Sequence, residues 1–198
     1  MDVSEQAAER FLVKHGLRPE RFSKEEMARG KTPDFRAFKS DGLFLYCEAK
    51  HVQRDAWLDK LLQESAPGEP VGGVRDSDPI FNRLTGHIHQ AVKQFEAVNP
   101  NHQYPNVLFL TNSDHQCRYD DLISVFTGNF YTSAGEAEPI YRQYSEGRVK
   151  EDKVKIDLYV WWNEWMSREP RPHFNDVSPF YLSLCELLKS DPRLHRVL

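Results

Sequence analysis

Two carboxylates and a lysine in the first quarter of the chain could bind a metal ion beside a phosphate. Asp34 follows a proline, and Glu48 and Lys50 stand two residues apart further along. Two oxygen ligands that leave other positions open suit Mg²⁺, which keeps several waters and meets phosphate oxygens. A lysine beside such an ion could orient or deprotonate a water, or stabilise charge that grows on phosphoryl oxygens. These residue types therefore suit metal-assisted phosphoryl chemistry.

A predicted β-hairpin would bring these residues together. Strand-like runs over 32–38 and 43–50 flank the turn sequence Lys-Ser-Asp-Gly at 39–42, and Asp-Gly between such runs is a strong hairpin signal. A turn centred on that Asp-Gly pair would place Asp34 beside residues 47–49. Because side chains two apart in a strand share a face, Glu48 and Lys50 should project together.

Other segments carry the patterns of helices and buried strands. Ser4 is a plausible N-cap for a helix that would end at Gly16, and Pro79 could begin a helix over 80–98. Residues 106–111, NVLFLT, have the continuous apolar character of a buried strand. Further expectations are a helix over 56–64, a loop over 65–79, a helix over 119–126, a strand over 154–162 and a closing helix over 179–189. This order predicts an α/β or α+β fold in which helices pack on a mixed sheet.

The arrangement resembles the PD-(D/E)XK nuclease superfamily, which has the restriction-endonuclease-like fold. That family places an Asp and a Glu-x-Lys on adjacent strands of a hairpin, as expected here for Asp34, Glu48 and Lys50. The resemblance covers residues 4–112. It implies a core in αβββαβ order within a single domain of residues 1–198, with an elaboration over 113–198.

Two further features fit the family pattern. The family often has a leading helix with a metal-site glutamate, spaced Glu-x6-Leu-x3-Gly, and this spacing starts at Glu5 in the present chain. Many members also have, before a buried strand, a helix that contributes a glutamine or lysine. The segment HIHQAVKQF supplies Gln90, Lys93 and Gln94 in the corresponding place.

The resemblance implies a role for each residue. Asp34 and Glu48 would bind Mg²⁺, which Mn²⁺ could replace, and Lys50 would be the catalytic lysine. Glu5 would be an accessory metal ligand or orient the water. Gln94, with one of its two helix neighbours named above, would contact the site or the substrate phosphate. The implied function is hydrolysis of phosphodiester bonds in nucleic acid, DNA in the first instance, by in-line attack of water.

Other interpretations remain open at this point. The residues of the hairpin could form an ordinary cross-strand ion pair, Glu5 could only stabilise the positive end of its helix, and Gln94 could belong to a solvated helix face. His87 and His89 lie two residues apart on a predicted helix and so point in different directions, which favours surface or packing roles over a zinc site. The nuclease-like fold could also be an inactive binding or assembly module in a defence or repair complex, or a toxin or effector nuclease.

Composition excludes several classes of protein. The chain has 198 residues, 39% of them apolar and 28% charged, with 30 acidic against 26 basic side chains. These fractions are typical of a soluble globular protein, and the net charge of −4 excludes a histone-like polycation. No apolar run approaches the roughly 20 residues of a membrane span. Cys47, Cys117 and Cys185 match no C-x-x-C spacing and are expected to be small buried hydrophobes of a cytoplasmic protein.

The overall charge does not describe the predicted site. Residues 1–60 hold 12 basic against 11 acidic side chains, three of which are the candidate ligands. A divalent cation on those ligands would leave the surface around the hairpin positive. The candidates for contact with a nucleic-acid backbone are Arg29, Lys31, Arg36, Lys39 and Arg54. A protein partner or a homodimer would also be compatible with the sequence.

Overall fold

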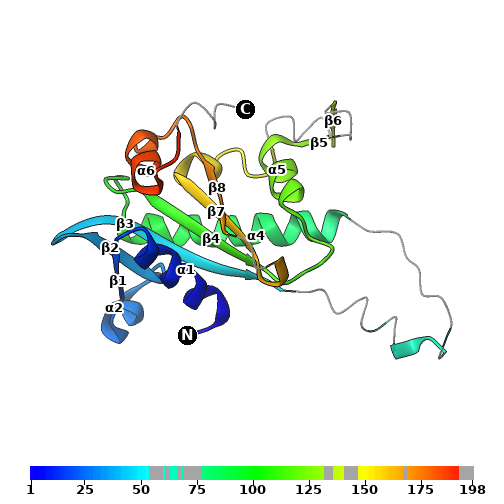
Figure 1. The fold of residues 1–198 in the computed structure, drawn as a ribbon, viewed down its shortest axis with the longest axis horizontal. Helices are drawn as coiled ribbons and strands as arrows, with labels where there is room; N and C mark the ends of the chain where they lie inside the picture. The colour runs from blue at the N-terminus through cyan, green and yellow to red at the C-terminus, as the bar shows by residue number, and fades with distance from the viewer. Residues whose placement is uncertain are drawn as a thin grey trace.

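A six-stranded mixed β-sheet lies at the centre of the fold (Figure 1). The computed structural model describes residues 1–53, 60, 63–66, 68, 77–131, 136–140, 147–166 and 169–191. In spatial order the strands are β1 (Arg18–Arg21), β2 (Phe35–Lys39), β3 (Gly42–Val52), β4 (Asn106–Asn112), β7 (Leu158–Asn163) and β8 (Arg171–Phe174). The three central strands β3, β4 and β7 are parallel, whereas the outer pairings are antiparallel. The predicted α+β fold with a mixed sheet is confirmed.

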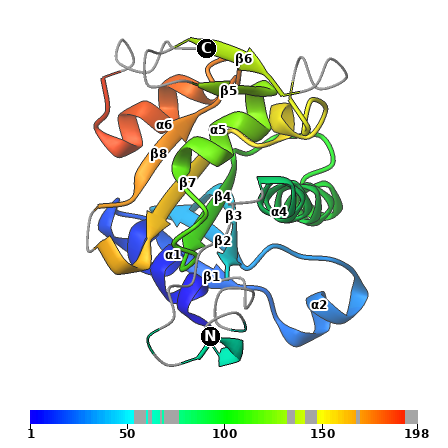
Figure 2. The same ribbon diagram turned by 90° about the vertical axis from the view of Figure 1, so that its right-hand side faces the viewer.

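Helices cover both faces of the sheet. Helices α1 (Val3–Lys14) and α6 (Tyr181–Leu188) lie on one side, and α4 (Ser77–Val98) lies on the other (Figure 2). Helix α5 (Tyr119–Thr127) packs in the same apolar cluster as α4. Alternation along the buried strand β4 divides the core, because Leu108 and Leu110 face α4 while the neighbouring side chains face α1 and α6.

Smaller elements lie outside these layers. A short helix α2 (Lys24–Arg29) buries none of its residues and projects from the body of the fold on the side of α4 (Figure 2). The described remainder is a two-stranded sheet, β5 (Asn129–Tyr131) with β6 (Ala137–Pro139), and two 3₁₀ helices, η2 (Lys153–Lys155) and η3 (Glu164–Met166).

The hairpin of β2 and β3 forms as expected, with a shifted turn. Lys39 pairs with Gly42, so the two turn residues are Ser40 and Asp41 rather than Asp41 and Gly42. Ser40 takes the left-handed conformation, with a φ of 55°. A bulge between Ala37 and Phe38 adds a second shift of register.

Several predicted boundaries are corrected by the structure. Asp2, not Ser4, caps α1: its carboxylate accepts from the N–H of Glu5, and the Glu5 carboxylate accepts from the N–H of Asp2. The strand expected from residue 154 begins at Leu158, since a 3₁₀ helix precedes it. Strands β1 and β8 and helix α2 were not predicted from the residues, although the αβββαβ order implied by the resemblance includes one strand besides the hairpin. Most of the helix expected over 56–64 and most of the loop expected over 65–79 lie outside the described residues, and 77–79 belong to α4.

Two general expectations can be compared with the described residues. Cys47, Cys117 and Cys185 are free and buried, as expected for small apolar side chains. None of the helices within the described ranges combines the length and the apolar character needed to cross a bilayer.

A buried carboxylate joins β4 and β7 at the N-terminal ends of these two strands. Asp157, which is fully buried, accepts hydrogen bonds from the N–H of Asn106 at 2.7 Å and from the Ser178 hydroxyl. Its Oδ2 is also 2.8 Å from Nε2 of His102. This bond raises the pKa of His102 above its ordinary value, against the opposing effect of partial burial.

The His102 interaction makes stability depend on pH. Because the folded pKa is raised, the contribution of His102 is fully present below its unfolded pKa of about 6.5 and is lost as pH rises through the folded value. We expect His102→Gln to lower the free energy of unfolding more at pH 6 than at pH 8, by less than about 1 kcal/mol for this part-exposed pair. Urea denaturation at the two pH values measures this difference, and an equal loss at both would contradict the assignment.

Candidate active site

The candidate site forms where β2 separates from β3. The first ladder pair of β2 is Phe35 with Cys47, whereas β3 continues to Val52 with β4 as its neighbour. Asp34 stands just before this first pair. Its Oδ2 accepts the N–H of Ala49 at 2.8 Å, and its own N–H donates to Oε2 of Glu48 at 3.0 Å. The side chain of Asp34 thus takes the place of the missing strand partner, and the predicted proximity of Asp34 to residues 47–49 is confirmed.

Glu48 and Lys50 project together toward α4, as strand alternation predicts. Glu48 is only 2% exposed, and Nζ of Lys50 lies 2.5 Å from its Oε1. Helix α4 contributes Gln94, whose Oε1 accepts from Nζ of Lys50 at 3.2 Å. The Gln94 amide nitrogen donates to the carbonyl of Thr32 at 2.9 Å. One glutamine therefore ties the lysine of β3 to the segment that leads into β2.

The carboxyl groups of Asp34 and Glu48 both have raised pKa values. Burial, followed by the nearby charge of Asp34, raises the pKa of Glu48 to about 8, although Lys50 and Gln94 oppose the rise. Burial also raises the pKa of Asp34, and the charge of Glu5 adds to that effect. A single ammonium group does not offset the buried carboxylate of Glu48 and the partly buried one of Asp34, so a further positive charge at this point would be stabilising.

Glu5 lies close to the site, but other groups hold its carboxylate. Its Oε1 accepts from Arg21 of β1 at 2.6 Å, while its Oε2 accepts from the N–H of Asp2 at 3.0 Å. Its charge nevertheless reaches Asp34. Among the residues that the structure describes, no group of three or more His, Cys, Asp or Glu side chains is placed to hold a metal ion. The structure therefore brings the carboxylates of Asp34 and Glu48 together, whereas the nearby carboxylate of Glu5 is paired with Arg21.

The other predicted contacts of α4 differ in position. Gln94 contacts Lys50, whereas Gln90 and Lys93 are exposed on the same helix. His89 is also exposed and pairs with Asp152, as expected for a surface histidine.

Two residues near the site were not recognised from the sequence as belonging to it. Arg21 holds Glu5, but the strand that carries it was not predicted. His87 is partly buried, and Lys50 is the charged group that affects its pKa most. The seven-residue spacing of His87 and Gln94 could have placed both on one side of α4, since seven residues make about two helical turns.

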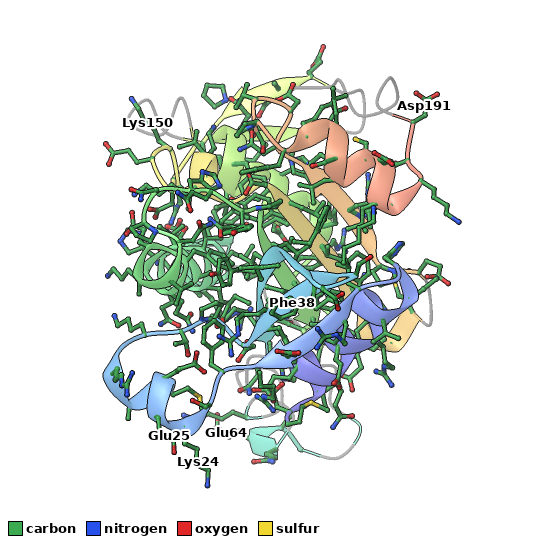
Figure 3. The ribbon with its side chains drawn as sticks, turned by 90° about the vertical axis from the view of Figure 1, so that its left-hand side faces the viewer. Lys24, Glu25, Phe38, Glu64, Lys150 and Asp191 are labelled. Carbon is green, nitrogen blue, oxygen red and sulfur yellow. The ribbon has the colours of Figure 1, made fainter. Side chains whose placement is uncertain are left out.

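The basic residues proposed to contact a nucleic-acid backbone lie around the helix α2 and the hairpin. Arg29, Lys31 and Lys39 are exposed. Arg36 instead forms hydrogen bonds to Glu26 of α2 and lies over the ring of Phe22. Lys24 and Glu25 of α2 extend away from the sheet (Figure 3). Arg54 lies outside the described residues.

Two carboxylates with an ammonium group beside them are side-chain types that could hold a divalent cation with open coordination positions. Two carboxylates suit Mg²⁺, which usually binds through one or two carboxylates together with waters and phosphates. They do not suit a structural zinc site, which needs four protein ligands. Comparisons of the chain with protein-family models, with curated proteins and with solved structures found no match.

Proposed function

We propose that the protein is a divalent-metal-dependent nuclease of the PD-(D/E)XK type that hydrolyses phosphodiester bonds of nucleic acid, DNA in the first instance. The observation that carries the proposal is the convergence of Asp34, Glu48, Lys50 and Gln94 at the point where β2 separates from β3. These four residues come from three separate segments: the residue before β2, strand β3 and helix α4. An incidental surface ion pair would not bury Glu48 to 2% exposure.

The order of elements supports a restriction-endonuclease-like core. Helix α1, strands β1, β2 and β3, helix α4 and strand β4 follow one another in the αβββαβ order, with the short helix α2 inserted after β1. In this core the hairpin supplies the carboxylates and the lysine, and α4 supplies the glutamine. The elements after β4 add strands β7 and β8 to the same sheet.

The carboxylate pair fits a bound Mg²⁺ or Mn²⁺. Asp34 and Glu48 would hold the ion, and its charge would offset the burial that raises the pKa of both groups and the charge of Asp34 that adds to the rise at Glu48. A bound Mg²⁺ would polarise the phosphate and lower the pKa of an attacking water. Glu5 could act as an accessory ligand only after its carboxylate leaves Arg21.

Side chains of the protein would orient the water, stabilise the developing charge and bind the nucleic-acid backbone. The ammonium group of Lys50 would orient the attacking water or stabilise the charge that grows on the phosphoryl oxygens. Gln94 keeps that ammonium on the side of α4, because its carbonyl accepts from Nζ while its amide nitrogen is held by Thr32. Arg29, Lys31 and Lys39 are exposed and could contact neighbouring backbone phosphates.

Removal of the lysine or of one carboxylate should abolish cleavage. We expect Lys50→Ala and Asp34→Ala to lower Mg²⁺- or Mn²⁺-dependent cleavage at least about 100-fold, since each removes a group that acts at the reacting phosphate. Lys155→Ala is the matched control, because Lys155 pairs with Glu96 away from the site. Single- and double-stranded DNA and RNA should all be assayed. Normal cleavage by both folded variants would remove the assignment.

Replacement of Glu48 by glutamine should raise stability when no metal is present and remove the stabilisation that Mg²⁺ gives. The folded pKa of about 8 lies above the unfolded value of about 4.3, so stability linked to the protonated form is lost as pH rises through 8. Without metal, Glu48→Gln should therefore have a higher Tm than the wild type at pH 9, and the difference should shrink toward pH 6.

The same variant tests metal binding. Mg²⁺ at about 100 times its Kd should stabilise the wild type by about 2.7 kcal/mol and leave Glu48→Gln nearly unaffected. Thermal melts with and without Mg²⁺ measure both effects. Equal Mg²⁺ gains in the two proteins would show that Glu48 is not a ligand. No gain in either would favour a binding or assembly module over a nuclease.

A further inference from the structure

A buried ring nitrogen beside the candidate site lacks a hydrogen-bond partner. Nε2 of His87 is buried and has no partner among the described residues. Most buried polar atoms in proteins are hydrogen-bonded, so such an atom needs an explanation. His87 lies two turns before Gln94 on α4, and therefore on the same side of the helix.

The surroundings of His87 are rich in hydrogen-bond donors. Burial and then the positive charges of Lys50, Arg83 and His51 lower the pKa of His87 to about 4. The imidazole is therefore neutral near pH 7, and one of its two nitrogens accepts hydrogen bonds without donating. Arg83 pairs with Asp114 through Nη2, while its buried Nε has no partner among the described residues, and Nε2 of His51 lies 2.9 Å from the Ser113 hydroxyl.

Lys50 is the donor of the candidate site that could use this acceptor, since its charge affects the pKa of His87 most. An ammonium group has three N–H donors, and Oε1 of Glu48 and Oε1 of Gln94 account for two of them. The bond to Glu48 is the shorter of the two and becomes an ion pair when Glu48 is ionised, so it holds the ammonium in the metal-free protein. A cation on Glu48 would repel the ammonium and compete for the same carboxylate.

We propose that His87 is a positioning residue for Lys50, and that its Nε2 accepts a hydrogen bond from the Lys50 ammonium when the Glu48 carboxylate is withdrawn from it. This inference rests on the proposed function, in which a cation occupies Glu48 during the reaction. The Lys50 ammonium would then shift from Gln94 toward His87, the two acceptors that lie on one face of α4. It would stay beside the substrate phosphate and would not turn into solvent.

The contact can be tested without metal or substrate. Glu48→Met removes the carboxylate and keeps an unbranched side chain of similar length, which imitates the loss of the ion pair. With ¹⁵N-labelled histidine, we expect the Nε2 resonance of His87 to move upfield in Glu48→Met relative to the wild type, as an acceptor nitrogen does on hydrogen bonding. Glu48→Gln should give a smaller shift in the same direction, and Lys50→Met added to Glu48→Met should abolish it. An unchanged Nε2 resonance in both Glu48 variants would overturn the proposal.

Cleavage kinetics give a second measurement. His87→Leu should lower kcat about tenfold, the effect of one hydrogen bond to a charged group, and leave KM unchanged. His87→Gln offers an acceptor oxygen and should recover most of that loss, while His89→Leu on the exposed side of α4 is the matched control. Equal losses in His87→Leu and His87→Gln would contradict a positioning role. If the wild type cleaves no substrate, the proposed function fails. The metal-free spectra then decide alone whether Nε2 of His87 accepts a hydrogen bond from Lys50.

Discussion

The candidate site depends on one pair of reciprocal hydrogen bonds, between the N–H of Asp34 and the Glu48 carboxylate and between the Asp34 carboxylate and the N–H of Ala49. These bonds close the β2–β3 ladder at the point where the backbone of β2 turns away. They satisfy polar groups that burial would otherwise leave unpaired, and they also hold two carboxylates together inside the fold. The feature that completes the sheet is therefore the same feature that concentrates negative charge.

The sequence was sufficient to predict the convergence of Asp34, Glu48 and Lys50 because short-range rules govern it. Strand alternation places Glu48 and Lys50 on one face, and a tight turn returns the chain to Asp34. The turn lies one residue earlier than expected, but the expected partners of Asp34 spanned residues 47–49, which include its observed contacts. Gln94 could be predicted only through the resemblance to a family pattern, since it meets Lys50 across 44 positions of the chain.

The features that escaped prediction are those without a local signal. Strands β1 and β8, with the sequences RPER and RPHF, lie at the edges of the sheet, where polar residues and proline are tolerated and the usual strand pattern is weak. Because β1 was not located in the sequence, the ion pair between Arg21 and Glu5 could not be predicted. Glu5 was expected as an accessory ligand, as a water-orienting residue or as a helix-terminal charge. At the start of α1, Asp2 and Ser4 are both good capping residues, and only the geometry distinguishes them.

The hydrogen bonds of Gln94 restrict which residue can occupy position 94. Its carbonyl oxygen must accept from Lys50 while its nitrogen donates to the carbonyl of Thr32. A glutamate could accept but not donate, a lysine could donate but not accept, and an asparagine is shorter by one methylene group. The same two bonds fix the orientation of the amide, because a rotated amide would set its nitrogen against the ammonium and its oxygen against a carbonyl. Position 94 therefore accepts a glutamine and excludes these three near-equivalents, although the side chain itself carries no charge.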